Sequence, residues 1–203
     1  MAEIKIQPKK PSPISYVLYA LALVAIVYMV IRSLTASKNP VQTPTVIVDT
    51  TDVAGSVNDF VSFLGDTTNT RVDTEKSPAY TSYGLYLLSA AIGATATRDA
   101  ANDSNIIQRS TRLQAISDSI QNHWTPIEKS VRVRDAFLRA AGLMDAIQAK
   151  KYPNLKQQVA IVKQKAEAIN PNQEVRFQKP KVEQFFQQSA AALQAMVQKA
   201  KTE

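Results

Sequence analysis

Residues 14–31 read Ile14-Ser-Tyr-Val-Leu-Tyr-Ala-Leu-Ala-Leu-Val-Ala-Ile-Val-Tyr-Met-Val-Ile31, an 18-residue run without a charged side chain. An α-helix rises about 1.5 Å per residue, so about 20 apolar residues span the roughly 30 Å hydrocarbon core of a bilayer. The run is longer than the roughly 7–15 apolar residues of a typical signal peptide. We therefore predict an uncleaved transmembrane anchor over residues 14–34, with cleavage after the small residues near Thr35 as the alternative.

The residues that flank this anchor predict its orientation. Lys5, Lys9 and Lys10 precede it, whereas Arg32 and Lys38 follow it. Basic residues accumulate on the cytoplasmic side of membrane helices. We expect residues 1–13 to form a basic cytoplasmic tail, the anchor to lie in a bacterial inner (cytoplasmic) membrane, and the bulk of the chain to be periplasmic.

The sequence after the anchor divides into a spacer and one domain. Residues 35–51 contain Pro40 and Pro44 among polar residues and lack apolar periodicity, which is typical of an extended Pro/Thr spacer. Residues 52–203 form a segment of about 150 residues, the ordinary size of one domain. We predict that this segment is a helical extracytoplasmic domain.

Apolar residues recur at helical spacing through most of residues 52–203. Capping and breaking residues divide this pattern into helices. These signals are Gly65, Ser77-Pro78, Asn102 or Asp103, the capping box Thr125-Pro-Ile-Glu128, Tyr152-Pro153, Asn170-Pro171 and Pro180. The sequence therefore predicts an all-α fold, in which one N-terminal transmembrane helix precedes an antiparallel helical bundle of five to six helices.

Two alternatives to this bundle stay open in the sequence. Residues 79–97 lack charge, as a second membrane span would, but they contain several hydroxyl side chains and two glycines. We interpret them as a helix buried within the bundle. A solenoid of stacked helix pairs is the other alternative.

The spacing also predicts which side chains form the core. The expected apolar faces include Val61 and Leu64 in the first helix and Val131 in the fourth. Phe177 has the spacing of a core residue, and Phe185 is expected at the edge of the last helix's apolar face.

No residue pattern predicts catalysis. The chain has no cysteine and one histidine, His123, so thiolate sites and multi-histidine metal sites within one chain are excluded. No Glu-x-x-His pair and no phosphate-binding glycine motif occurs. We expect no enzyme activity, no catalytic residue, no metal and no cofactor.

The net charge of +7 is unevenly distributed. Residues 41–149 carry nine basic and twelve acidic side chains, whereas residues 150–203 carry ten basic and four acidic ones. The basic part lacks the exposed aromatic side chains of a nucleic-acid surface, so we expect no nucleic-acid partner. The candidates for contact with an anionic surface are Lys150, Lys151, Lys163 and Lys165.

Candidates for contact with a protein partner are aromatic. Tyr80, Tyr83 and Tyr86 recur every three residues, and Trp124 precedes the capping box. Tyrosine and tryptophan are enriched at protein interfaces. We expect a non-catalytic, single-span scaffold, an accessory or structural subunit of a larger membrane complex such as a respiratory or photosynthetic assembly. Its partners are the lipid bilayer and other subunits; the alternative is a ligand-binding module or a tether of the cell envelope.

Overall fold

The computed structural model describes residues 52–74, 77–122 and 129–202. These residues form an all-helical fold, as the sequence predicted. The α-helices are α2 (Val53–Gly65), α3 (Ala79–Ala100), α4 (Ser104–Asn122), α5 (Lys129–Lys151), α6 (Lys156–Glu167) and α7 (Lys179–Ala200). Two short 3₁₀ helices, η2 (Pro153–Leu155) and η3 (Val175–Gln178), precede α6 and α7.

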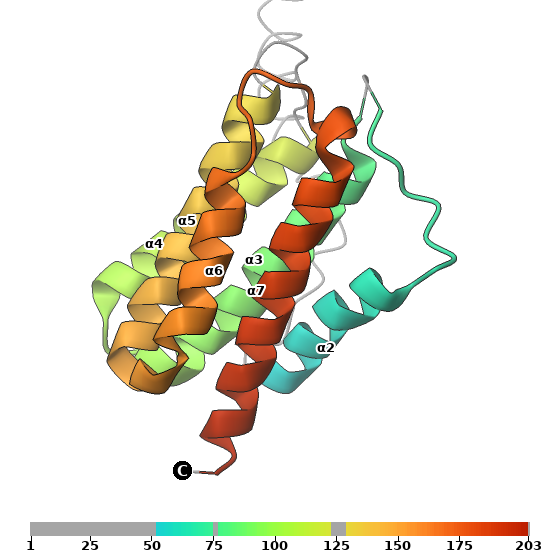
Figure 1. The fold of residues 1–203 in the computed structure, drawn as a ribbon. Coiled ribbons are helices and arrows are strands. Elements are labelled where there is room, and N and C mark those ends of the chain that lie inside the picture. The colour runs from blue at the N-terminus through green and yellow to red at the C-terminus, as the bar shows by residue number, and fades with distance from the viewer. Residues whose placement is uncertain (1–51, 75–76, 123–128, 203) are drawn as a thin grey trace, which may run out of the picture. The chain divides into compact units, whose positions relative to one another are not determined.

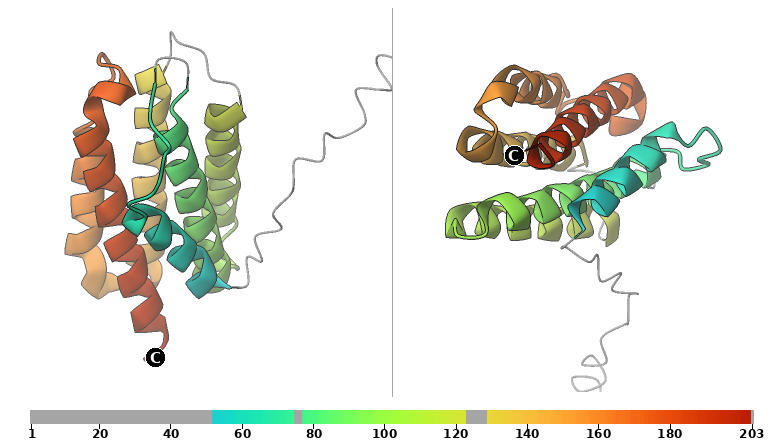
Figure 2. Two further views of the ribbon diagram at one scale, coloured as in Figure 1. Left: turned by 90° about the vertical axis from the view of Figure 1, so that its right-hand side faces the viewer. Right: turned by 90° about the horizontal axis from the view of Figure 1, so that it is seen from below.

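The helices form a bundle in which consecutive members reverse direction (Figure 1). Helices α2, α3 and α4 lie in one layer, and α5, α6 and α7 lie in the other (Figure 2). Helix α3 contacts α2, α4, α5 and α7, and α2 also contacts α7. In a solenoid each unit contacts only its neighbours along the chain. The contacts of α7 with α2 and α3 therefore exclude a solenoid and confirm a bundle.

Helix α3 is the uncharged segment that resembled a second span. Its buried side chains are mostly small, and they include Leu85, Ala91, Ala94 and Thr95. The Thr95 hydroxyl donates to the Ala91 carbonyl at 2.8 Å, so this buried polar group is satisfied within its own helix. The interpretation as a helix buried in the bundle is confirmed.

Several helix ends match the local sequence signals. Helix α2 ends at Gly65, α5 ends before Tyr152-Pro153, and α7 has Pro180 in its first turn. The Asp103 carboxylate accepts the Ile106 backbone N–H at 3.2 Å, which caps α4. These ends depend on one or two neighbouring residues, which explains why the sequence predicts them.

The start of α3 differs from the prediction. Pro78 occupies the N-cap position instead of Ser77, and no side chain at that position makes a capping hydrogen bond. The Asp73 carboxylate caps the helix from the preceding loop, because it accepts both the backbone N–H of Thr81, at 2.9 Å, and the Thr81 hydroxyl. The prediction failed because this cap lies eight residues upstream of its partner.

The end of α6 also differs from the prediction. The helix stops at Glu167, before Asn170-Pro171. Gln178 is buried and closes the loop that follows: its amide accepts the Asn170 N–H at 2.7 Å and donates to the carbonyls of Asn170 and Gln173. The hydroxyl of Ser130, on α5, also donates to the Gln173 carbonyl. Long-range hydrogen bonds thus replace the last helical turn.

The core confirms most of the predicted apolar faces, including Val61 and Leu64, which are partly buried and pack against it, and it corrects three positions. Val131 and Phe177 are 56% and 62% exposed. Phe185 is fully buried instead of lying at an edge, since its ring stacks on Phe137 with centroids 4.1 Å apart. Helix α2 buries Phe63 more completely than Leu64, the neighbouring residue that the prediction placed on the apolar face. Spacing along one helix does not show which neighbouring helices cover it.

Some predictions fall outside the described residues. They are the tail, the anchor, the spacer, His123, Trp124 and the capping box that ends at Glu128. Within the described ranges, no helix is both long enough and apolar enough to span a bilayer.

We expect alanine substitutions at two glycines of the bundle to change the free energy of unfolding in opposite directions. A Cβ atom at Gly84 would lie 2.5 Å from a ring carbon of Phe186 and 2.8 Å from one of Phe63, whereas a Cβ at Gly142 would approach only Arg109 Nη2, at 3.2 Å. We expect Gly84→Ala to lower the free energy of unfolding by about 1–3 kcal/mol through overpacking. Gly142→Ala should raise it by up to about 1 kcal/mol, because alanine favours the helix and the arginine end can move.

Urea denaturation of the full chain in mild detergent, followed by circular dichroism, measures both free energies. Equal effects of the two substitutions would contradict the close approach of α2 and α7 to α3.

Candidate functional site

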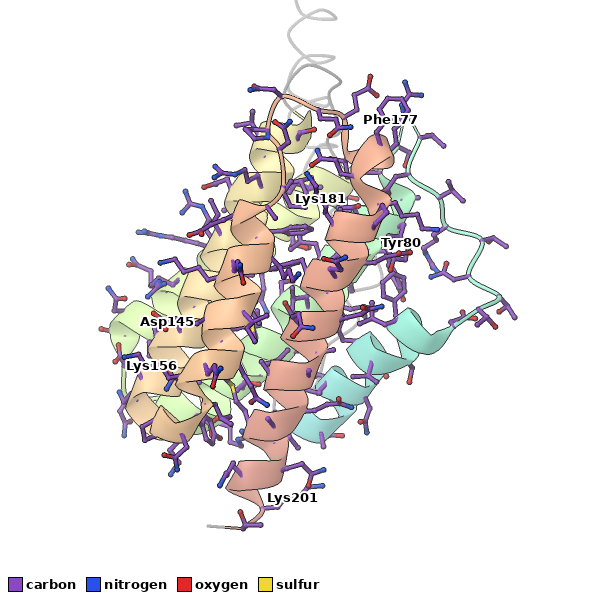
Figure 3. All side chains as sticks on the ribbon, viewed as in Figure 1. Tyr80, Asp145, Lys156, Phe177, Lys181 and Lys201 are labelled. Atoms are coloured by element: carbon purple, nitrogen blue, oxygen red, sulfur yellow. The ribbon has the colours of Figure 1, made fainter. Side chains whose placement is uncertain are left out.

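The three tyrosines predicted to contact a partner all lie on α3 and are all partly buried. A helix turns about 100° per residue, so Tyr86 lies about 120° around the helix from Tyr80. The row winds from the side of α7, where Figure 3 shows Tyr80, toward α4: burial and then the Asp118 carboxylate, on α4, raise the pKa of Tyr86. We call Tyr80, Tyr83 and Tyr86, together with Arg71 and Lys179, the tyrosine surface.

Buried phenylalanines support the inner sides of these rings. The ring of Phe63, on α2, lies 5.1 Å from that of Tyr80 and 5.5 Å from that of Tyr83. The ring of Phe186, on α7, lies 6.1 Å from that of Tyr80. Such aromatic pairs favour fixed relative orientations. Tyr80 and Tyr83 are thus held against the core, and Tyr86 stacks on Tyr83 with ring centres 6.2 Å apart.

Two cations lie over the rings. The guanidinium carbon of Arg71, in the loop between α2 and α3, lies 3.9 Å from the centre of the Tyr83 ring. The Lys179 ammonium lies 5.8 Å from the centre of the Tyr80 ring. These distances are typical of cation–π contacts. Helical spacing indicates neither cation, because Arg71 lies in the loop before α3 and Lys179 lies on α7, outside the helix that carries the tyrosines.

Burial and nearby acids shape the protonation of this surface. Burial, reinforced by the carboxylates of Glu183 and Asp73, raises the pKa of Tyr80 to about 12. Burial also raises the pKa of Asp73, although the hydrogen bonds from Thr81 and the charge of Lys179 act in the opposite direction. The Tyr80 hydroxyl is therefore a neutral hydrogen-bonding group at neutral pH.

The predicted lysine candidates separate into two places. Lys150 and Lys151 lie in the last turn of α5, and Lys163 and Lys165 lie on α6. Lys150 forms an ion pair with Asp103 at 3.0 Å, and Lys165 donates to the Gln184 side chain at 3.0 Å. Lys163 is exposed. Lys150 and Lys165 are thus occupied by contacts within the bundle, and contact with an anionic surface stays a prediction.

A buried polar network lies where α3 and α5 end. Arg98 pairs with Asp99, whose side chain is 4% exposed, at 2.7 Å. The Tyr152 hydroxyl donates to Asp99 at 2.7 Å and accepts from Arg98 at 2.8 Å. Burial is the largest cause of the raised pKa of Tyr152. These three groups are hydrogen-bonded to one another, so the network joins the ends of two helices.

The described part of the chain contains no group of three or more histidine, cysteine, aspartate or glutamate side chains placed to hold a metal ion. Trp124 and His123 lie outside that part. No protein-family model, curated protein or solved structure matches this chain.

The raised pKa of Tyr80 predicts a stability loss at high pH. An unfolded tyrosine ionises near pH 10 and folded Tyr80 near pH 12, so its contribution to stability is complete below pH 10 and is lost as the pH rises toward 12. We expect Tyr80→Phe, which cannot ionise, to lose less stability than the wild type between pH 10 and 12. Urea denaturation at a series of pH values measures this; parallel curves would show that Tyr80 titrates normally.

Proposed function

We propose that this chain is a non-catalytic scaffold: a single-span, membrane-anchored accessory subunit of a larger membrane complex, with its helical domain on partner subunits in the periplasm. The uncharged run at residues 14–31 supports the anchor. The tyrosine surface is the observation that carries the partner contact.

The tyrosine surface has the composition of an interface. Its rings are partly exposed, and Tyr is enriched where proteins meet. Phe63 and Phe186 hold Tyr80 in place before any partner arrives, so binding requires little further ordering of this side chain.

The cations of this surface specify the chemistry of the partner. Arg71 and Lys179 lie over the rings at the edge of an aromatic centre; Lys179 is paired with Glu183 at 3.6 Å, so Arg71 is the cation that a partner carboxylate or carbonyl would meet. A matching partner presents an apolar patch bordered by carboxylates or free backbone carbonyls. Charges at the rim of an interface mainly govern the rate of association and its dependence on salt.

Purification at native abundance in a mild detergent tests the scaffold. We expect the chain to migrate with one large complex in a fixed stoichiometry. A chain that migrates as a monomer would contradict the proposal. In that case, a melting temperature that rises with a small molecule would favour a ligand-binding module. Retention on cell wall that is lost at high salt would favour an envelope tether.

Site-specific photo-crosslinking tests which face binds. We would place p-benzoylphenylalanine at position 86, and at position 163 of α6 as an exposed control. Within the isolated complex, position 86 should give one adduct with a fixed subunit, and position 163 should give none. Equal adducts at both positions would show that the tyrosine surface is not the docking face.

A further inference from the structure

Helices α4 and α5 border a half-open surface pocket of about 280 Å³ that is lined by Arg109, Arg112, Leu138 and Arg139. Arg109 and Arg112 are three residues apart on α4, so they share one face of that helix. Leu138 and Arg139 belong to α5. Three arginines from two helices thus line one pocket beside one apolar side chain; Arg109 is partly buried, and Arg112 and Arg139 are exposed.

The guanidinium groups of this pocket are poorly neutralised by the protein. Arg139 pairs with Asp135 at 2.7 Å, and that carboxylate precedes it by one helical turn. Within the described residues, Arg109 and Arg112 form no ion pair with a carboxylate. Like charges at this spacing repel each other. A bound anion would remove that repulsion.

The backbone of α5 makes room for one of these groups. The Cβ atom that Gly142 lacks would lie 3.2 Å from Nη2 of Arg109. The Arg109 side chain is partly buried, and its end therefore crosses from α4 to the α5 backbone instead of extending into solvent. This position restricts the side-chain conformations of Arg109 before a ligand binds. The entropic cost of ordering the guanidinium on binding is therefore lower.

We propose that the α4–α5 pocket binds the phosphate group of a small phosphomonoester. Arginine presents a planar pair of N–H donors that matches the oxygens of phosphate. The pocket volume lies at the lower limit of ligand sites, roughly 300–1,000 Å³, and suits one phosphate with a short carbon chain against Leu138. The same group occurs in soluble phosphomonoesters and in the headgroup of phosphatidic acid.

Titration calorimetry of the full chain in maltoside micelles with glycerol 3-phosphate tests the pocket. We expect saturable binding with one site per chain. Arg109→Gln with Arg112→Gln should weaken the affinity at least tenfold, or about 1.4 kcal/mol. Lys156→Gln with Lys163→Gln removes the same charge from exposed positions on α6 and should change the affinity less than twofold. Binding that does not saturate, or equal losses in both double variants, would overturn the proposal.

A conservative double variant separates the guanidinium geometry from charge alone. Arg109→Lys with Arg112→Lys keeps both charges but loses the paired donors, so we expect a several-fold loss of affinity. If this variant bound glycerol 3-phosphate with wild-type affinity, the ligand would be held by diffuse electrostatic attraction to the positive charges, and the proposed phosphate site would be overturned. Circular dichroism and melting temperature must match the wild type. Should the α4 variants unfold, Arg139→Gln gives the same test from α5.

A second titration identifies the source of the phosphate. Dihexanoyl phosphatidic acid carries the same phosphomonoester on short acyl chains. Tighter binding than glycerol 3-phosphate, lost in the Arg109→Gln, Arg112→Gln variant, would assign the pocket to a lipid headgroup. Equal or weaker binding would assign it to a soluble ligand. The tyrosine surface plays no part in these titrations, so their outcome is independent of the scaffold proposal.

Discussion

The close approach of four helices to α3 is the constraint on which the rest of the structure depends. Small side chains on α3 permit it, and at Gly84 the rings of Phe63 and Phe186 occupy the space that a Cβ atom would need. Glycine weakens an isolated helix by about 1 kcal/mol, and the packing of Phe63 and Phe186 at Gly84 offsets that loss. The packing also places Phe63 and Phe186 beneath the tyrosines. The candidate docking face is therefore a consequence of how the core is built.

The sequence predicts the helices well wherever a boundary depends on adjacent residues. Gly65, Asp103 and Pro180 act through the backbone within one turn, and the structure confirms all three. The burial of α3 also follows from its lack of charge. Asp73 and Gln178 escape prediction because they bond to backbone eight residues away, across a loop. Amphipathic spacing gives no information on which loop will return to a helix end.

The same distinction applies to the aromatic residues. Spacing places Tyr80, Tyr83 and Tyr86 on one helix, but their surroundings come from α2, α7 and the loop between α2 and α3. Phe177 and Phe185 show how much this matters, since one is 62% exposed and the other is stacked in the core. Both belong to apolar patterns in the sequence. Tertiary contacts determine which of the two side chains is exposed to solvent.

The pairing of each cation affects anion binding more than the number of cations does. The lysine-rich C-terminal part looked like the anionic-surface site, yet Lys150 is bound by Asp103. The middle of the chain is acidic overall, yet Arg109 and Arg112 meet there without a carboxylate partner in the described residues. A cation already paired has little left to offer an incoming anion, whereas unpaired guanidinium groups in a pocket gain from one. Net charge along the sequence conceals this difference, and the antiparallel contact of α4 with α5 creates it.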